Sequence, residues 1–125
     1  MKLTKNFNLS EFACKDEAAT PVPSGLIGNV QLLADNIQVL RDDIGTPVDI
    51  LSGYRTPAHN AKVGGKPNSF HMKAMAGDLA AKEFTPKQLY LRIEKLIRAG
   101  KMKAGGLGLY PGFVHYDVRG RNVRF

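Results

Sequence analysis

The stretch SFHMKAMAGD, at residues 69–78, decides how the rest of this chain must fold. It holds His71 and ends in Asp78, and a second stretch, VHYD at residues 114–117, holds His115. A catalytic zinc ion commonly takes three protein ligands from His, Asp and Glu and leaves a fourth position open. His71, Asp78 and His115 therefore form a candidate metal site for one zinc ion per chain.

The spacing between His71 and Asp78 requires the chain to reverse. On one continuous helix the two residues would lie roughly 10 Å apart along the axis, whereas Zn–N and Zn–O bonds are only about 2.0–2.2 Å long. Small residues between the two permit a tight turn: Ala74, Ala76 and Gly77. We therefore expect a turn between the two ligands and a short buried strand at residues 76–81 that carries Asp78.

The second stretch has the composition of a strand. Residues 113–119, FVHYDVR, are rich in aromatic and β-branched side chains. Because alternate side chains of a strand share a face, His115, Asp117 and Arg119 are expected to point the same way. Asp117 could there orient a metal ligand or act as the general base that takes a proton from the attacking water.

These residues resemble a known pattern. The arrangement Ser69-x-His71-x-x-Ala74-x-Ala76-x-Asp78 resembles the Ser-x-His-x-x-Gly-x-Ala-x-Asp signature of zinc D-alanyl-D-alanine peptidases, the group of lysostaphin, D-Ala-D-Ala carboxypeptidase and hedgehog-type metallopeptidases. SGYRTP at 52–57, HN at 59–60 and GG at 64–65 are similar to the small branch found in phage endolysins and bacterial wall hydrolases. GLY at 108–110 and FVHYDVR are similar to that branch's closing motif. The likeness covers about residues 3–120.

The resemblance implies a function and a set of roles. It implies zinc-dependent hydrolysis of a peptide bond in the peptidoglycan stem peptide or cross-link, as a D-Ala-D-Ala carboxypeptidase-like enzyme or an endopeptidase. The matching family Arg contacts the substrate peptide or helps to polarise the scissile carbonyl, which makes Arg55 a candidate catalytic and substrate-binding residue. Ser69 and Tyr54 are further candidate substrate-binding residues, and Tyr110 and Tyr116 are candidates to line the cleft.

Two departures from the pattern concern the site. Ala74 replaces the signature glycine, and no Glu or His stands shortly before His115, where many relatives place one. Asp117 is therefore the candidate general base if it faces the open metal position; if it pairs with Arg119 instead, the base is unidentified. Strand parity places Glu83 on the face opposite Asp78.

Length and composition limit the number of domains and the classes of partner. The chain has 125 residues, 43% of them hydrophobic, which fits a single domain spanning 1–125 with an ordinary core. The lone Cys14 excludes an intrachain disulfide framework. The net charge of +7 favours anionic partners, without a nucleic-acid motif to select them. No signal-peptide h-region or membrane-length run is present, so we expect delivery to the cell wall by phage lysis, a holin pore or the virion.

Hydrophobic periodicity gives the scaffold. Apolar residues at three- and four-residue steps predict a long helix at 25–43 capped by Ser24, and a second at 86–99. Thr56 and Pro57 predict a short helix near 57–62 that carries His59, a rim residue without an acidic neighbour. Strands are expected at 47–53 and 76–81, with a hairpin of 105–110 and 113–119. The predicted fold is α+β: a small, mainly antiparallel sheet that carries the zinc site, packed with two long helices.

Two other functions stay open from the sequence. One is a non-catalytic, zinc-containing module that binds the cell wall or forms part of a phage particle. The other is a basic nucleic-acid-binding domain that happens to contain histidines, which salt-dependent duplex binding would indicate. Neither the bond that is cut nor the oligomeric state follows from the sequence, and a monomer is assumed.

Overall fold

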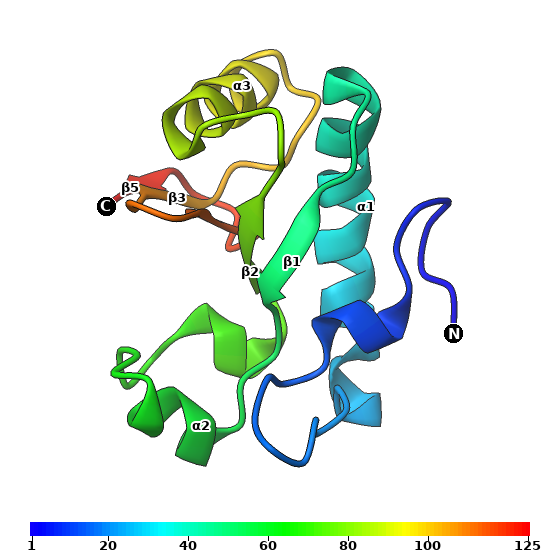
Figure 1. The fold of residues 1–125 in the computed structure, drawn as a ribbon, viewed down its shortest axis with the longest axis vertical. Coiled ribbons are helices and arrows are strands. Elements are labelled where there is room, and N and C mark those ends of the chain that lie inside the picture. Colours follow the sequence, from blue (N-terminus) through cyan, green and yellow to red (C-terminus); the bar gives the residue numbers. More distant parts are fainter.

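Five strands form one sheet at the centre of the structure (Figure 1). The computed structural model describes all residues 1–125. The strands are β1 (Asp49–Ser52), β2 (Ala76–Ala80), β3 (Gly106–Leu109), β4 (Val114–Asp117) and β5 (Val123–Arg124). Their order is β1-β2-β4-β3-β5, and every neighbouring pair is antiparallel except β3 with β5. The α+β fold with a mainly antiparallel sheet is confirmed.

Three α-helices accompany the sheet. They are α1 (Ile27–Ile44), α2 (Pro57–Lys62) and α3 (Pro86–Arg98), and single 3₁₀ turns are η1 (Leu9–Phe12), η2 (Ser24–Leu26) and η3 (Phe70–Lys73). Both α2 and α3 begin with proline after a threonine whose hydroxyl accepts a backbone N–H, as the Thr–Pro pairs predict. No helix is long and apolar enough to cross a membrane.

The structure differs from the predicted elements in several places, and all four predicted strands are shorter than expected. The first long helix begins at Ile27, and Ser24 lies inside the 3₁₀ turn before it without making a side-chain cap. Strand β1 is shorter than the predicted 47–53. Strand β5 was not expected, because two residues that pair with the edge of β3 are too few to leave a periodic pattern.

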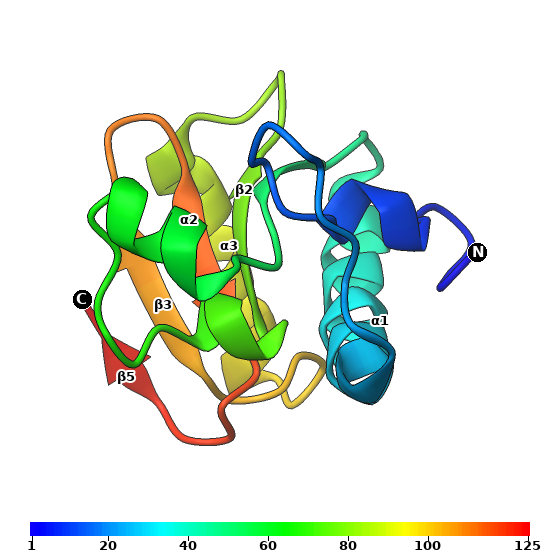
Figure 2. The ribbon, with the colours of Figure 1, turned by 90° about the horizontal axis from the view of Figure 1, so that it is seen from below.

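The two faces of the sheet carry different sets of residues. Gly77 of β2 faces α1, since a Cβ there would lie 3.6 Å from Ile37 Cδ1. Because side chains alternate along a strand, Asp78 lies on the opposite face, and it pairs in register with His115 of β4. Figure 2 shows α2 on one side of the sheet and α3 on the other. The fold therefore packs a hydrophobic core on one face and leaves the candidate ligands on the other.

The end of β1 depends on a close approach between two backbones. A Cβ on Gly53 would lie 2.9 Å from both Cα and O of Phe12. We expect Gly53→Ala to lower the free energy of unfolding by about 1–3 kcal/mol, the usual cost of overpacking, as measured by urea denaturation.

Gly28→Ala is the matched control, because Gly28 is exposed in α1 with no neighbour within 4 Å. It is expected to stabilise the protein by about 0.4–1 kcal/mol through the unfolded chain. Equal stability of Gly53→Ala and the wild type would contradict the close approach.

Candidate metal centre

A tight turn brings His71 back to Asp78. His71 lies in η3, whose first N–H groups are capped by Ser69: its hydroxyl accepts a hydrogen bond from the His71 backbone N–H at 3.2 Å. Ala74 then takes a left-handed conformation with φ of 55°, and β2 begins two residues later. His71 Nε2 consequently lies 3.2 Å from Asp78 Oδ1. Glycine adopts this conformation without the roughly 1–2 kcal/mol that a Cβ adds, which accounts for glycine at this place in the resembled signature.

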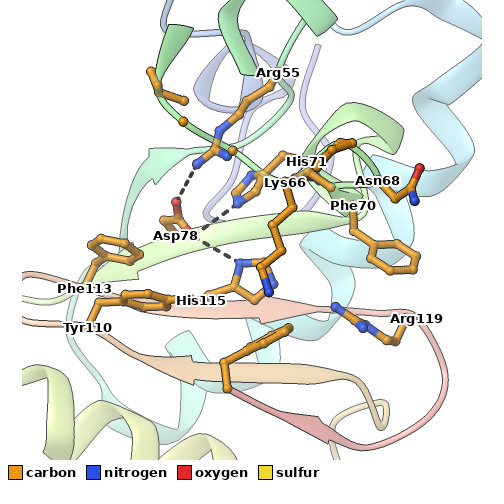
Figure 3. Close-up of a pocket in the computed structure, with 16 residues that line it drawn as sticks. Arg55, Lys66, Asn68, Phe70, His71, Asp78, Tyr110, Phe113, His115 and Arg119 are labelled. Carbon is orange, nitrogen blue, oxygen red and sulfur yellow. Dashed lines mark hydrogen bonds and ion pairs between the residues drawn. The ribbon is translucent and has the colours of Figure 1, made fainter. Parts of the chain in front are cut away.

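The pairing of β2 with β4 supplies the third candidate ligand. His115 Nδ1 lies 3.3 Å from Asp78 Oδ1, and the three ligand atoms all lie within 4.8 Å of one another (Figure 3). Two ligand atoms on a tetrahedral zinc ion with bonds of about 2.0–2.1 Å are about 3.3 Å apart. The spacing of the three groups therefore suits a zinc ion.

The protonation pattern gives an independent argument for a cation at this point. His71 Nδ1 donates to the carbonyl oxygen of Gly53 at 2.8 Å, and His115 Nε2 donates to Asp117 Oδ2 at 2.8 Å. A neutral imidazole carries only one N–H, so the other nitrogen of each ring presents a lone pair to Asp78 Oδ1. Three acceptors meet at one place, and either a metal ion or extra protons must lie among them.

Arg55 fixes the other oxygen of Asp78. Its Nη2 donates to Asp78 Oδ2 at 3.1 Å, while Nε and Nη1 donate to Ser52 Oγ and Asn60 Oδ1, each at 3.2 Å. The guanidinium is therefore held at three points, and Asp78 Oδ1 remains directed at the two histidines. Such partners of a metal-ligating carboxylate orient it and tune its affinity for the ion.

Asp117 lies behind His115 and is fully buried. Its Oδ2 accepts from His115 Nε2 and from Arg119 Nη2, both at 2.8 Å, and its Oδ1 accepts from the Gly106 N–H at 2.8 Å and from Arg119 Nε at 2.9 Å. A Cβ on Gly106 would collide with this carboxylate. Asp117 thus shares a face with His115 and Arg119, as strand parity predicts, and it does not line the cavity beside the ligands.

These contacts shift the pKa values of the ionisable groups in the site. Burial alone would raise the pKa of Asp78, but hydrogen bonds from His115 and His71 outweigh it and hold that pKa well below its usual range. Burial likewise opposes the ionised form of Asp117, whose pKa is lowered by His115 and Arg119. For His115, burial disfavours the charge, yet the contacts with Asp117 and Asp78 raise its pKa above 6.5.

The ligands open into a cavity of about 670 Å³. Asp78 is the only carboxylate among its lining residues, whereas Arg55, Lys66 and Arg119 are cationic. Aromatic side chains form much of the remaining wall: Phe70, Tyr110, Phe113 and Phe125. The cavity is therefore a basic and aromatic cleft with the candidate ligands in its floor.

The structure places some of the other sequence-predicted site residues in the wall of the cavity and others outside it. Arg55, Ser69 and Tyr110 line the cavity. Tyr54 does not, since only 8% of it is exposed and it belongs to the core. Tyr116 is also in the core, where its hydroxyl donates to the Lys103 carbonyl at 2.7 Å.

Neither His59 nor Glu83 lines this cavity. Several residues that were not predicted as site residues do line the cavity. They are Lys66, Phe70, Phe113 and Phe125, and Asn60 supports Arg55 from behind. Most of them come from loops, where periodicity carries no information. The one signal in the sequence for these residues was Gly65. A Cβ at this position would clash with Asn60, the residue that supports Arg55.

The chain is similar to a known family of peptidases. A family model described as Peptidase M15 matches residues 5–117, a range that contains all three candidate ligands and ends at Asp117. No curated protein sequence matches the chain significantly.

Zinc affinity should depend on pH because the metal must displace the proton of His115. The raised pKa extends this competition above the usual histidine range. We expect apparent affinity to rise by up to about tenfold per pH unit below that pKa and to level off above it. Competition with a zinc-binding dye between pH 5.5 and 8.5 measures this, and a flat profile would contradict the site.

Asp117→Asn should weaken zinc binding because it removes the charge that keeps the proton on His115 Nε2. Loss of such a partner typically costs about 10–100-fold in metal affinity. The same dye competition measures the change, and circular dichroism verifies that the variant is folded. Asp35→Asn, at an exposed position of α1, is the matched control. Unchanged affinity in a folded Asp117→Asn protein would exclude this role.

Proposed function

The chain belongs to the peptidase M15 family of zinc-dependent peptidases, and from this membership we propose that it hydrolyses a peptide bond in the stem peptide or cross-link of peptidoglycan. Carboxypeptidase action on a terminal D-Ala-D-Ala and endopeptidase action within the wall are the two forms of this activity. The motif likeness to the endolysin branch favours phage lysis, a holin pore or virion delivery as the route to the wall.

The observation that carries the proposal is the meeting of three unshared electron pairs in the floor of an open cavity. His71 Nε2, Asp78 Oδ1 and His115 Nδ1 are the atoms that would hold zinc. When bound there, zinc supplies Lewis-acid chemistry that polarises a peptide carbonyl and makes water a stronger nucleophile. The cavity above the three atoms is large enough to admit a peptide segment.

Arg55 has two roles in the proposal. It positions Asp78 through Nη2, and each of its terminal nitrogens carries a second N–H beyond the bonds already described. Because Arg55 lines the cavity, these N–H groups can donate to a carbonyl oxygen of the substrate. Ser69 lines the same wall and caps η3. We leave Tyr54 out of the substrate-binding set because its ring belongs to the core.

Strand parity allows Asp117 either to orient a metal ligand or to act as the general base. We assign it the orienting role. Its oxygens are occupied by His115, Arg119 and the Gly106 N–H, and it is screened from the cavity. Its charge keeps the proton on His115 Nε2, so that the Nδ1 lone pair remains available to the metal. The general base is therefore sought elsewhere than Asp117.

One observation favours a second candidate, a zinc-containing module that binds the wall without cutting it. Apart from the candidate ligands, no carboxylate or imidazole lines the cavity to accept a proton. Such a module would bind zinc and peptidoglycan and release no product. The experiment that tests cleavage also distinguishes the two functions.

The test is mass spectrometry of purified sacculi incubated with the zinc-loaded protein, with and without a chelator. We expect new muropeptides that disappear with the chelator. Loss of a terminal alanine would identify a carboxypeptidase, and split stem peptides or cross-links an endopeptidase. His71→Ala should abolish the products, while His59→Ala, at the histidine outside the cavity, should retain them.

No product from several wall types, with protein shown to contain zinc, would overturn the peptidase proposal. Binding of that protein to sacculi would then support the wall-binding module. Products that persist in both the chelator and His71→Ala would place the activity outside this site.

A further inference from the structure

The cavity carries an excess of positive charge that zinc ligation does not require. Arg55 is paired with Asp78 and Arg119 with the buried Asp117, whereas Lys66 lines the cavity without a salt-bridge partner. A divalent ion would add to the excess. A cleft of one sign favours ligands of the opposite sign, so the molecule that occupies this cavity is expected to carry negative charge.

The Arg119 guanidinium is held in place along one edge, and its other edge is free to donate hydrogen bonds. Its Nε and Nη2 donate to Asp117, and Nη1 makes no hydrogen bond within the protein. The guanidinium carbon lies 4.3 Å from the centre of the Phe70 ring and 5.3 Å from that of Phe125. Only 12% of the Arg119 side chain is exposed. A guanidinium held in this way is already oriented, so little conformational entropy is lost when it binds an anion.

Lys66 supplies a second cation near the same Phe125 ring. Its Nζ lies 5.6 Å from the centre of the Phe125 ring and forms no salt bridge. The loop that carries it is anchored, because the Lys66 carbonyl accepts from Asn60 Nδ2 at 2.9 Å. Lys66 and Arg119 thus share Phe125 as a neighbour in the lining of the cavity.

The part of the cavity beyond His115 has a different character. The rings of Tyr110 and Phe113 stack there with centroids 4.8 Å apart, on the other side of His115 from Arg119 (Figure 3). On one side of His115 the cavity therefore combines the Arg119 cation with aromatic rings, and on the other side its wall is aromatic without a cation. A peptide that spans the ligands would be oriented by this difference.

We propose that Arg119 and Lys66 form a carboxylate-binding subsite, and that the substrate is a peptide with a free carboxylate close to the scissile bond. The proposal rests on the peptidase function and deepens it by naming the substrate class. Stem peptides carry two kinds of carboxylate, at the C-terminus and on D-glutamate or diaminopimelate residues. Both present the planar pair of oxygens that a guanidinium edge and an ammonium group bind.

The test compares three synthetic stem peptides with the zinc-loaded protein. The first has free carboxylates, the second a C-terminal carboxamide, and the third an amidated side-chain carboxylate. We measure kcat/KM by chromatography and the binding of the corresponding product peptides by calorimetry. Hydrogen bonds to charged groups lead us to expect that one amidation lowers kcat/KM by about tenfold or more. The position that does so identifies which carboxylate is bound.

Variants connect this preference to the two residues. Lys66→Met should reduce the preference for the free carboxylate about threefold or more, and Arg119→Lys, which loses the planar fork, should reduce it further. Lys73→Met is the matched control: Lys73 also lies over an aromatic ring, 4.8 Å from the centre of Phe70, but does not line the cavity. Zinc affinity is measured for each variant, because Arg119 also contacts Asp117.

The outcomes separate this proposal from the proposed function. Equal kcat/KM for the three peptides, or a preference that persists in Lys66→Met and Arg119→Lys, would overturn the subsite and leave the peptidase intact. Absence of cleavage with a preserved calorimetric preference that Lys66→Met reduces would overturn the peptidase and support the subsite.

Discussion

The structure depends on one buried oxygen atom, Asp78 Oδ1, and on the two imidazole nitrogens that face it. Negative charge and lone pairs are costly to bring together away from water unless a cation joins them. The fold makes this arrangement unavoidable, because the opposite atom of each group is fixed by a different part of the chain. The Gly53 carbonyl after β1, the Arg55 guanidinium and the Asp117 carboxylate supply these contacts.

Glycine determines how closely these parts approach. Gly53 lets the chain pass close to Phe12 of η1 while its carbonyl accepts from His71, Gly65 admits Asn60 behind Arg55, and Gly106 leaves room for Asp117. In each case a Cβ would meet backbone or a buried polar group. These three glycines therefore serve contacts around the ligands, rather than loops that merely connect elements.

The sequence predicted the parts of the site that depend on short-range geometry. The turn before β2 followed from bond lengths, and the common face of His115, Asp117 and Arg119 followed from strand parity. Parity could not decide whether Asp117 faces the cavity or pairs with Arg119, because both lie on the same side of the strand. Tyr54 and Arg55 follow β1 in an irregular segment, where strand parity does not apply, so the sequence could not predict that Arg55 lines the cavity while Tyr54 belongs to the core. Lys66, Phe70 and Phe125 were beyond reach because tertiary packing alone brings their segments together.

The pairing of β2 with β4 gives the site a role in reporting folding. Asp78 and His115 lie 37 residues apart in sequence, and all of α3 and β3 lies between them. Closing a loop of that length costs chain entropy, which the pairing of β2 with β4 offsets in the folded chain. A complete set of three ligands consequently exists only in chains whose sheet is assembled. Stable occupancy by a metal ion therefore marks those chains that have finished folding.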